Sequence, residues 1–266
     1  MKETKIKITK EDLKELKIAK ELLENPGLAA KITNFIGKPI ENGLEKLPQK
    51  WSAKLGKITK NSLLKAADAA VFTMKNTSKK KSSNIFHTTA AAVTGGLGGF
   101  FGLPGLAIEL PISTTIMLRS IADISREHGE SITSIETKLA CLEVFALGGN
   151  STSDDGTEAG YFVVRALLAK SVSEAAKFIV EKGVIEESAP VLLRLITKIA
   201  ERFSVQISEK AAGQSIPIIG AAGGVLINIM FMDHFQDMAK GHFIVRKLER
   251  KYNPETVKET YNTIHI

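Results

Sequence analysis

Two long stretches of this chain contain no Lys, Arg, Asp or Glu, and they limit the folds that it can adopt. They cover residues 82–108 and 211–232. Both are rich in Gly, Ala and Pro, with Gly95-Gly-Leu-Gly-Gly99 in the first and Gly220, Gly223 and Gly224 in the second. Small residues recur four positions apart, a spacing that lets helix backbones approach closely. The sequence therefore predicts two Gly-rich apolar helical hairpins.

Three interpretations of these segments remain open. They form buried hairpins inside a helical bundle, hairpins that insert partly into one leaflet, or two true spans, because roughly 20 apolar residues cross a hydrocarbon core. Pro104, Pro111 and Pro217 disfavour a straight span. Glu109 disfavours deep insertion, since a carboxylate at the centre of a bilayer is costly.

The remainder of the chain favours helices. Aromatic residues make up only 6% of it, and no sustained alternation of apolar and polar residues predicts a sheet. Caps, Gly and Pro residues delimit helices over about 9–24, 28–47, 50–74, 106–128, 133–149, 157–182, 187–208 and 233–252, with a short last helix after Pro254. The expected fold is all-α, a multi-helix bundle around the two Gly-rich hairpins with no substantial sheet.

Positive charge is concentrated in the first third of the chain. Residues 1–85 hold 19 Lys against 9 Asp or Glu, although the whole chain has a net charge of only +7. The polar run 76–84 separates this part from the rest and predicts two regions, a basic helical N-terminal region (1–84) and a main helical domain (85–266). A basic region of this kind is typical of contact with a polyanion.

An anionic lipid surface fits that polyanion better than nucleic acid does. The basic region has no zinc motif and no aromatic stacking platform. Lysines flank Trp51 on an amphipathic stripe, as in helices that lie at a membrane interface. The predicted membrane contacts are Lys50, Trp51, Lys54, Lys57, Phe100 and Phe101. The competing interpretation is a solvated basic face that packs on the protein's own core.

Charged residues also interrupt the apolar helices at regular spacing. Arg119, Asp123 and Arg126 fall on one helix face, and Asp233, Asp237 and Lys240 repeat that spacing later. Paired charges in or beside the core explain them, because an unpaired buried charge is costly. The alternative is a polar site for a ligand or for catalysis between the two hairpins, formed by Glu109, Arg119, Asp123, Asp233, His234 and Asp237.

Several other chemistries lack their sequence signals. The Gly-rich run has neither the Lys-Ser/Thr of a P-loop nor the pattern of a dinucleotide fold. His234 and His242 are eight residues apart, too far for a helical metal pair, so no metal or cofactor is expected. The single cysteine, Cys141, lies in an apolar run and is expected to be buried. The charged start shows no secretory signal, so the expected location is cytoplasmic.

From about residue 104 onward the chain resembles the EcsC protein family. The resemblance lies in segments 109–129, 136–149, 208–211 and 231–250. It implies a bacterial protein and, since the family is named for a member encoded beside the subunits of an ABC transporter, a possible link to such a transporter. It implies no catalytic residues.

Two functional hypotheses follow. The first is a protein at the inner face of the membrane that binds anionic lipid or an integral membrane protein and adjusts transport or envelope function. The second is a soluble hydrolase-like enzyme that uses the polar site. The sequence favours binding over catalysis and assigns no catalytic residue.

Overall fold

The structure, a computed structural model, consists of helices throughout the part that it describes. It describes residues 8–24, 27–37, 51–73, 107–148, 160–182, 189–214 and 220–266, and these contain no strand. A helix covers residues 107–127. The others are α1 (Lys10–Glu24), α2 (Leu28–Ile36), α4 (Trp51–Thr73), α6 (Ile135–Glu143), the 3₁₀ turn η1 (Val144–Ala146), α7 (Tyr161–Lys182), α8 (Pro190–Gln214), α9 (Gly220–Tyr252) and α10 (Pro254–Thr263). The all-α prediction is confirmed.

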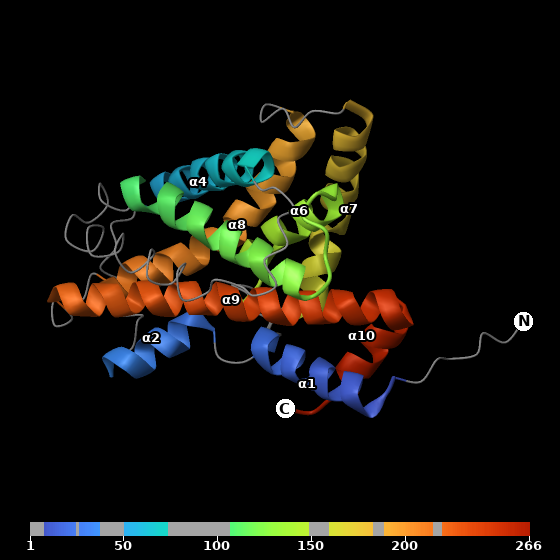
Figure 1. The fold of residues 1–266 in the computed structure, drawn as a ribbon. Coiled ribbons are helices and arrows are strands. Elements are labelled where there is room, and N and C mark those ends of the chain that lie inside the picture. Colours follow the sequence, from blue (N-terminus) through green and yellow to red (C-terminus); the bar gives the residue numbers. More distant parts are fainter. Residues whose placement is uncertain are drawn as a thin grey trace, which may run out of the picture.

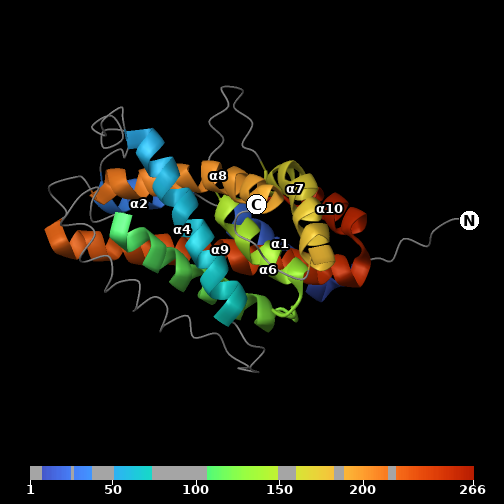
Figure 2. The ribbon, with the colours of Figure 1, turned by 90° about the horizontal axis from the view of Figure 1, so that it is seen from above.

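The longest helix, α9, forms the axis of the bundle (Figure 1). The helices α1 and α2 lie along one side of it, and the 107–127 helix and α8 lie on the other. The helix α4 packs on the outer face of α8, and α10 folds back beside the last turns of α9 (Figures 1 and 2). The helices α1 and α4, which belong to the predicted N-terminal region, contribute buried residues to the same core as the rest of the bundle. The predicted boundary at residues 84 and 85 lies outside the described residues.

Local capping explains where several helices begin. Thr9, which Glu11 and Asp12 follow, is predicted from the sequence to cap the first helix, and its hydroxyl does accept a hydrogen bond from the Asp12 amide at 3.2 Å. Asn253 caps α10 in the same way, accepting from the Thr256 amide at 2.9 Å, and Pro254 occupies the first turn. The sequence also predicts a capping box that begins with Thr133 and ends with Glu136, but the observed N-cap is Ser134, whose hydroxyl accepts a hydrogen bond from the Thr137 amide at 3.1 Å.

Two predicted boundaries are corrected by the structure. The helix expected to continue to Gly149 ends at Glu143 and tightens into η1. Gly148 then turns the chain with φ +73°, where its Cα packs against His234 and Met238 so closely that a Cβ would overlap both side chains. The charged helix expected from Asp233 begins at Gly220, so the apolar run and the charged run form one continuous helix.

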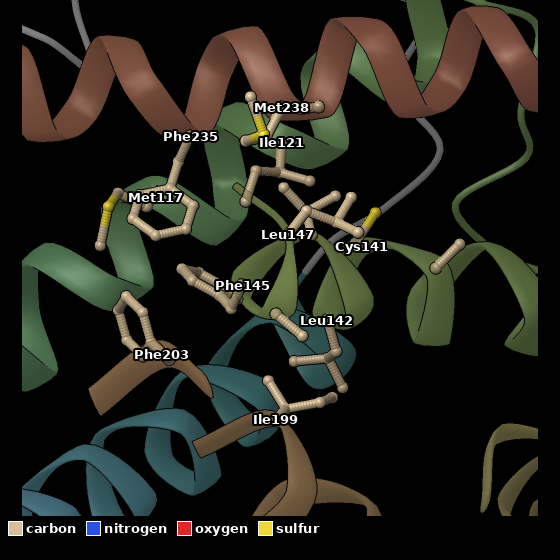
Figure 3. Packing of buried hydrophobic residues seen from close by; sticks show 14 of the residues in the cluster. Met117, Ile121, Cys141, Leu142, Phe145, Leu147, Ile199, Phe203, Phe235 and Met238 are labelled. Atoms are coloured by element: carbon tan, nitrogen blue, oxygen red, sulfur yellow. The ribbon is translucent and has the colours of Figure 1, made fainter. Parts of the chain in front are cut away.

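Aromatic rings fill the centre of the core between η1, α8 and α9 (Figure 3). The ring of Phe145 lies 4.9 Å from that of Phe203 and 5.4 Å from that of Phe235. Phe203 and Phe235 meet edge to face at 5.3 Å. Cys141 lies in the same cluster and is buried, as predicted. Such tilted ring contacts stabilise the core beyond their buried area.

The second uncharged segment is divided between two helices in contact. Residues 211–214 complete α8, and residues 220–232 open α9. The first segment lies outside the described residues up to residue 106. Within the described part of the chain, no helix is both long and apolar enough to cross a membrane.

Candidate functional site

Four helix ends meet at one end of the bundle. The 107–127 helix and α9 begin there, and α2 and α8 end there (Figures 1 and 2, left). Both Gly-rich segments lead into this end, because one precedes residue 107 and the other joins α8 to α9.

Large apolar side chains are exposed at the same end. Ile108 is 72% exposed and Ile112 47%, one helical turn apart at the start of the 107–127 helix. Phe35, in the last turn of α2, is 45% exposed, and Leu226, near the start of α9, is 42% exposed. We call these four residues the apolar end. Exposed apolar side chains are ordinary when scattered, but a group of them marks an interaction surface.

Exposed lysines accompany the apolar end. Lys54 and Lys57 lie in the first two turns of α4, which begins on the same side of the bundle (Figures 1 and 2). Leu55 between them is buried, so α4 is amphipathic as predicted. Trp51 begins the helix, but its side chain is not described, and the other predicted membrane contacts, Lys50, Phe100 and Phe101, lie outside the described residues.

The predicted polar site contains one fully buried ion pair. The ammonium of Lys210, on α8, lies 2.5 Å from a carboxylate oxygen of Glu109. It also lies 4.9 Å from the centre of the Phe231 ring on α9. Both charged side chains are almost completely buried. Glu109 therefore joins two helices in the core.

The other charges of the predicted polar site have separate partners. Asp123 pairs with Arg126 of its own helix at 2.7 Å. Asp237 pairs with Lys31 of α2 at 3.3 Å and lies 3.9 Å from Lys240. Arg119 and Asp233 are exposed. Partial desolvation and the nearby Asp237 raise the pKa of Asp233. These contacts match the paired-charge interpretation, and the hydrolase-like site stays a prediction.

His234 is buried in the core under Gly148. Desolvation lowers its pKa to about 3, so the imidazole is neutral at physiological pH. Among the described residues, neither ring nitrogen has a hydrogen-bond partner. The ring contacts the Gly148 backbone instead, which indicates a packing role.

A second buried polar network joins α7 to α9. The Tyr161 hydroxyl lies 2.9 Å from Nδ1 of His242 and accepts a hydrogen bond from Arg165 at 3.2 Å. The two terminal nitrogens of Arg165 donate hydrogen bonds to the two carboxylate oxygens of Glu249, at 2.7 and 3.1 Å. Burial raises the pKa of the neighbouring Glu143 to about 7. Tyr161 and His242 are 81 positions apart, so no local spacing pattern could reveal their contact.

No group of three or more His, Cys, Asp or Glu side chains in the described part of the chain could hold a metal ion. Burial raises the pKa of the Cys141 thiol to about 12. The thiol is therefore neither a ready ligand nor a ready nucleophile, since both roles need the thiolate.

The chain was compared with protein families, curated proteins and solved structures. The sequence model of the EcsC protein family matches residues 10–248. The match includes the basic N-terminal helices, which the resemblance from residue 104 onward did not cover. No curated protein and no solved structure matches the chain.

Proposed function

This chain belongs to the EcsC protein family, and on that premise we propose that it is a peripheral membrane protein. In this proposal the apolar end meets an anionic lipid surface at the inner face of the cytoplasmic membrane. The observation that carries it is the exposure of Ile108, Ile112, Leu226 and Phe35 where both Gly-rich segments join the bundle.

The apolar and electrostatic contributions expected from such a contact are large enough for binding to a membrane. Full burial of one Ile or Phe side chain contributes about 1.5–3 kcal/mol. The four side chains of the apolar end are 42–72% exposed, so together they supply the equivalent of about two such contributions when they enter the interface. Each lysine near an anionic leaflet adds about 1 kcal/mol. Lys54 and Lys57 would thus strengthen binding and make it sensitive to salt.

An integral membrane protein, such as an ABC transporter, is the second partner that this surface fits. The apolar end would then pack against exposed transmembrane helices, and the lysines would still face anionic headgroups. The proposal commits to lipid because the lysines and apolar side chains together match the chemistry of a bilayer interface. Transport or envelope function would be adjusted from that position.

The test is flotation of the purified full chain with lipid vesicles. Wild-type protein should float with vesicles of phosphatidylglycerol and phosphatidylcholine and should remain below vesicles of phosphatidylcholine alone. Replacing Ile108 and Ile112 by Ser should weaken binding by about tenfold or more, since about 1.4 kcal/mol corresponds to a factor of ten. Replacing Lys54 and Lys57 by Glu should have a comparable effect that disappears at high salt.

The matched control is Val180→Ser, because Val180 is 64% exposed and lies in the last turn of α7, on the other side of the bundle from the apolar end (Figure 1). It should leave flotation unchanged. The proposed surface is wrong if the Ile108/Ile112 and Lys54/Lys57 variants float like wild type. It is also wrong if wild type binds charged and uncharged vesicles equally well. Circular dichroism of each variant separates lost binding from lost folding.

A further inference from the structure

A groove of about 400 Å³ lies between α7 and α10, beside the end of α1. This is away from the apolar end, because α10 follows the last turn of α9 whereas the apolar end surrounds its beginning (Figure 1). Small-molecule sites are commonly of this size. The groove is therefore separate from the surface proposed for membrane contact.

Aromatic rings form much of the groove lining. Phe162 packs edge to face on Tyr161 at 4.9 Å and on Tyr261 at 5.1 Å. The Tyr161 hydroxyl already makes hydrogen bonds with His242 and Arg165 in the buried network. Both tyrosines are almost completely buried, so neither hydroxyl is offered to solvent. The lining is therefore apolar even where it is made by tyrosine.

One wall of the groove is aliphatic and exposed. Val163 is 52% exposed and Leu167 59%, one turn apart on α7, and both line the groove. Beyond them the outward face of α7 becomes charged, with Lys170 and Glu174. The apolar part of this face is thus limited to the length of the groove, apart from Val180 at the far end.

The groove has one cation without a carboxylate partner. Lys258 of α10 lies 5.9 Å from the Phe162 ring and has no ion pair among the described residues. Arg165 lies 5.8 Å from the same ring, but its charge is neutralised by Glu249. Glu24 of α1 also lines the groove, but its carboxylate lies 3.8 Å from the ammonium of Lys20. The charge available to a ligand is therefore positive.

From these features we infer that the groove binds a small amphipathic carboxylic acid. The apolar body would lie on Phe162 and against Val163 and Leu167, and the carboxylate would accept hydrogen bonds from Lys258. A sugar would lack polar partners on the aromatic lining, and a cation would be repelled by Lys258. An apolar body with one negative end matches both the lining and the charge.

The probe is octanoate, titrated into the full chain with isotope-labelled Val and Leu methyl groups. Octanoate should shift the methyl signals of Val163 and Leu167 in a saturable way and leave those of Val180 in place. Octanol, which has a similar chain but no charge, should bind about tenfold more weakly, because it loses a charge-assisted hydrogen bond.

Amino-acid substitutions test whether Lys258 binds the carboxylate of octanoate. Lys258→Gln should weaken octanoate binding about tenfold without changing octanol binding. Lys177→Gln, which removes an exposed lysine elsewhere on α7, should change neither. Leu167→Asp should abolish octanoate binding by placing a like charge beside the carboxylate, and its exposure makes folding tolerant of the change. Equal binding of octanoate and octanol, or matching shifts at Val180, would overturn the inference.

Discussion

Lys210 and Glu109, which are 101 positions apart in the chain, form a buried ion pair between two helices. Their contact, at 2.5 Å, joins α8 to the start of the 107–127 helix, immediately beneath the apolar end. One oxygen of Glu109 has no hydrogen-bond partner among the described residues. The pair therefore positions the helix that presents Ile108 and Ile112.

Breaking this pair should destabilise the fold strongly. Lys210→Met leaves Glu109 charged, buried and unpaired, a change that costs about 3–5 kcal/mol. Urea unfolding followed by circular dichroism measures it. The double variant Glu109→Leu with Lys210→Met should recover much of the loss, because no buried charge remains.

The control is Lys247→Met, which breaks the half-exposed pair of Lys247 with Glu15. An exposed pair contributes only about 0–1 kcal/mol. Equal losses for Lys210→Met and Lys247→Met would show that the buried pair has no special role.

A glycine on α9 permits the close approach of α1. A Cβ on Gly241 would lie 2.6 Å from Cγ of Leu23 and 3.0 Å from the backbone oxygen of Ala19. Gly241→Ala should therefore lower the midpoint of thermal unfolding. Gly224→Ala, in the same helix but with open space around the new Cβ, should raise stability by up to about 1 kcal/mol through helix propensity. If Gly241→Ala is also stabilising, α1 does not pack as described.

Glu209 should make stability depend on pH. Burial raises its pKa to about 7, although an amide hydrogen bond from Ala29 acts in the opposite direction. The folded state then holds a proton that the unfolded state releases near pH 4.5. The contribution of Glu209 to the free energy of unfolding is fully present below pH 4.5 and is lost as the pH rises through about 7. The loss is at most about 1.4 kcal/mol per pH unit.

Glu209→Gln should remove this pH-dependent part while keeping an acceptor for Ala29. Between about pH 5 and about pH 7.5 the free energy of unfolding of wild type should fall more steeply than that of the variant, so the difference between them should shift in favour of the variant. Glu201→Gln, exposed on the same helix, is the control. Parallel pH profiles for wild type and Glu209→Gln would contradict the burial of this carboxyl.

Local signals in the sequence predicted most of the helices. Thr9 and Pro26 fixed the limits of α1, and Pro254 fixed the start of α10, because capping and proline effects act within one turn. The Gly-rich segment 211–232 was predicted to be helical, but the change from apolar to charged residues at Asp233 was wrongly interpreted as the start of a new helix. In the structure α9 continues through that position from Gly220 to Tyr252, because a change of side-chain polarity does not interrupt the backbone hydrogen bonds of a helix.

The polar contacts were harder to predict than the helices. Glu109 was selected from the sequence, but its partner Lys210 was not, because their pairing depends on how distant helices pack. The same holds for Tyr161 and His242. Spacing along a helix predicts which charges share a face, as for Asp123 and Arg126, but not which partner lies opposite.

The most direct test of the proposed membrane contact uses a fluorescent label at Ile112. Cys141 is buried and its pKa is raised to about 12, so a thiol-reactive, polarity-sensitive dye should label only the new cysteine of Ile112→Cys. With phosphatidylglycerol vesicles, emission should shift to shorter wavelength at Ile112→Cys and remain unchanged at Val180→Cys. Unchanged emission at both positions, or the same shift at both, would contradict attachment through the apolar end.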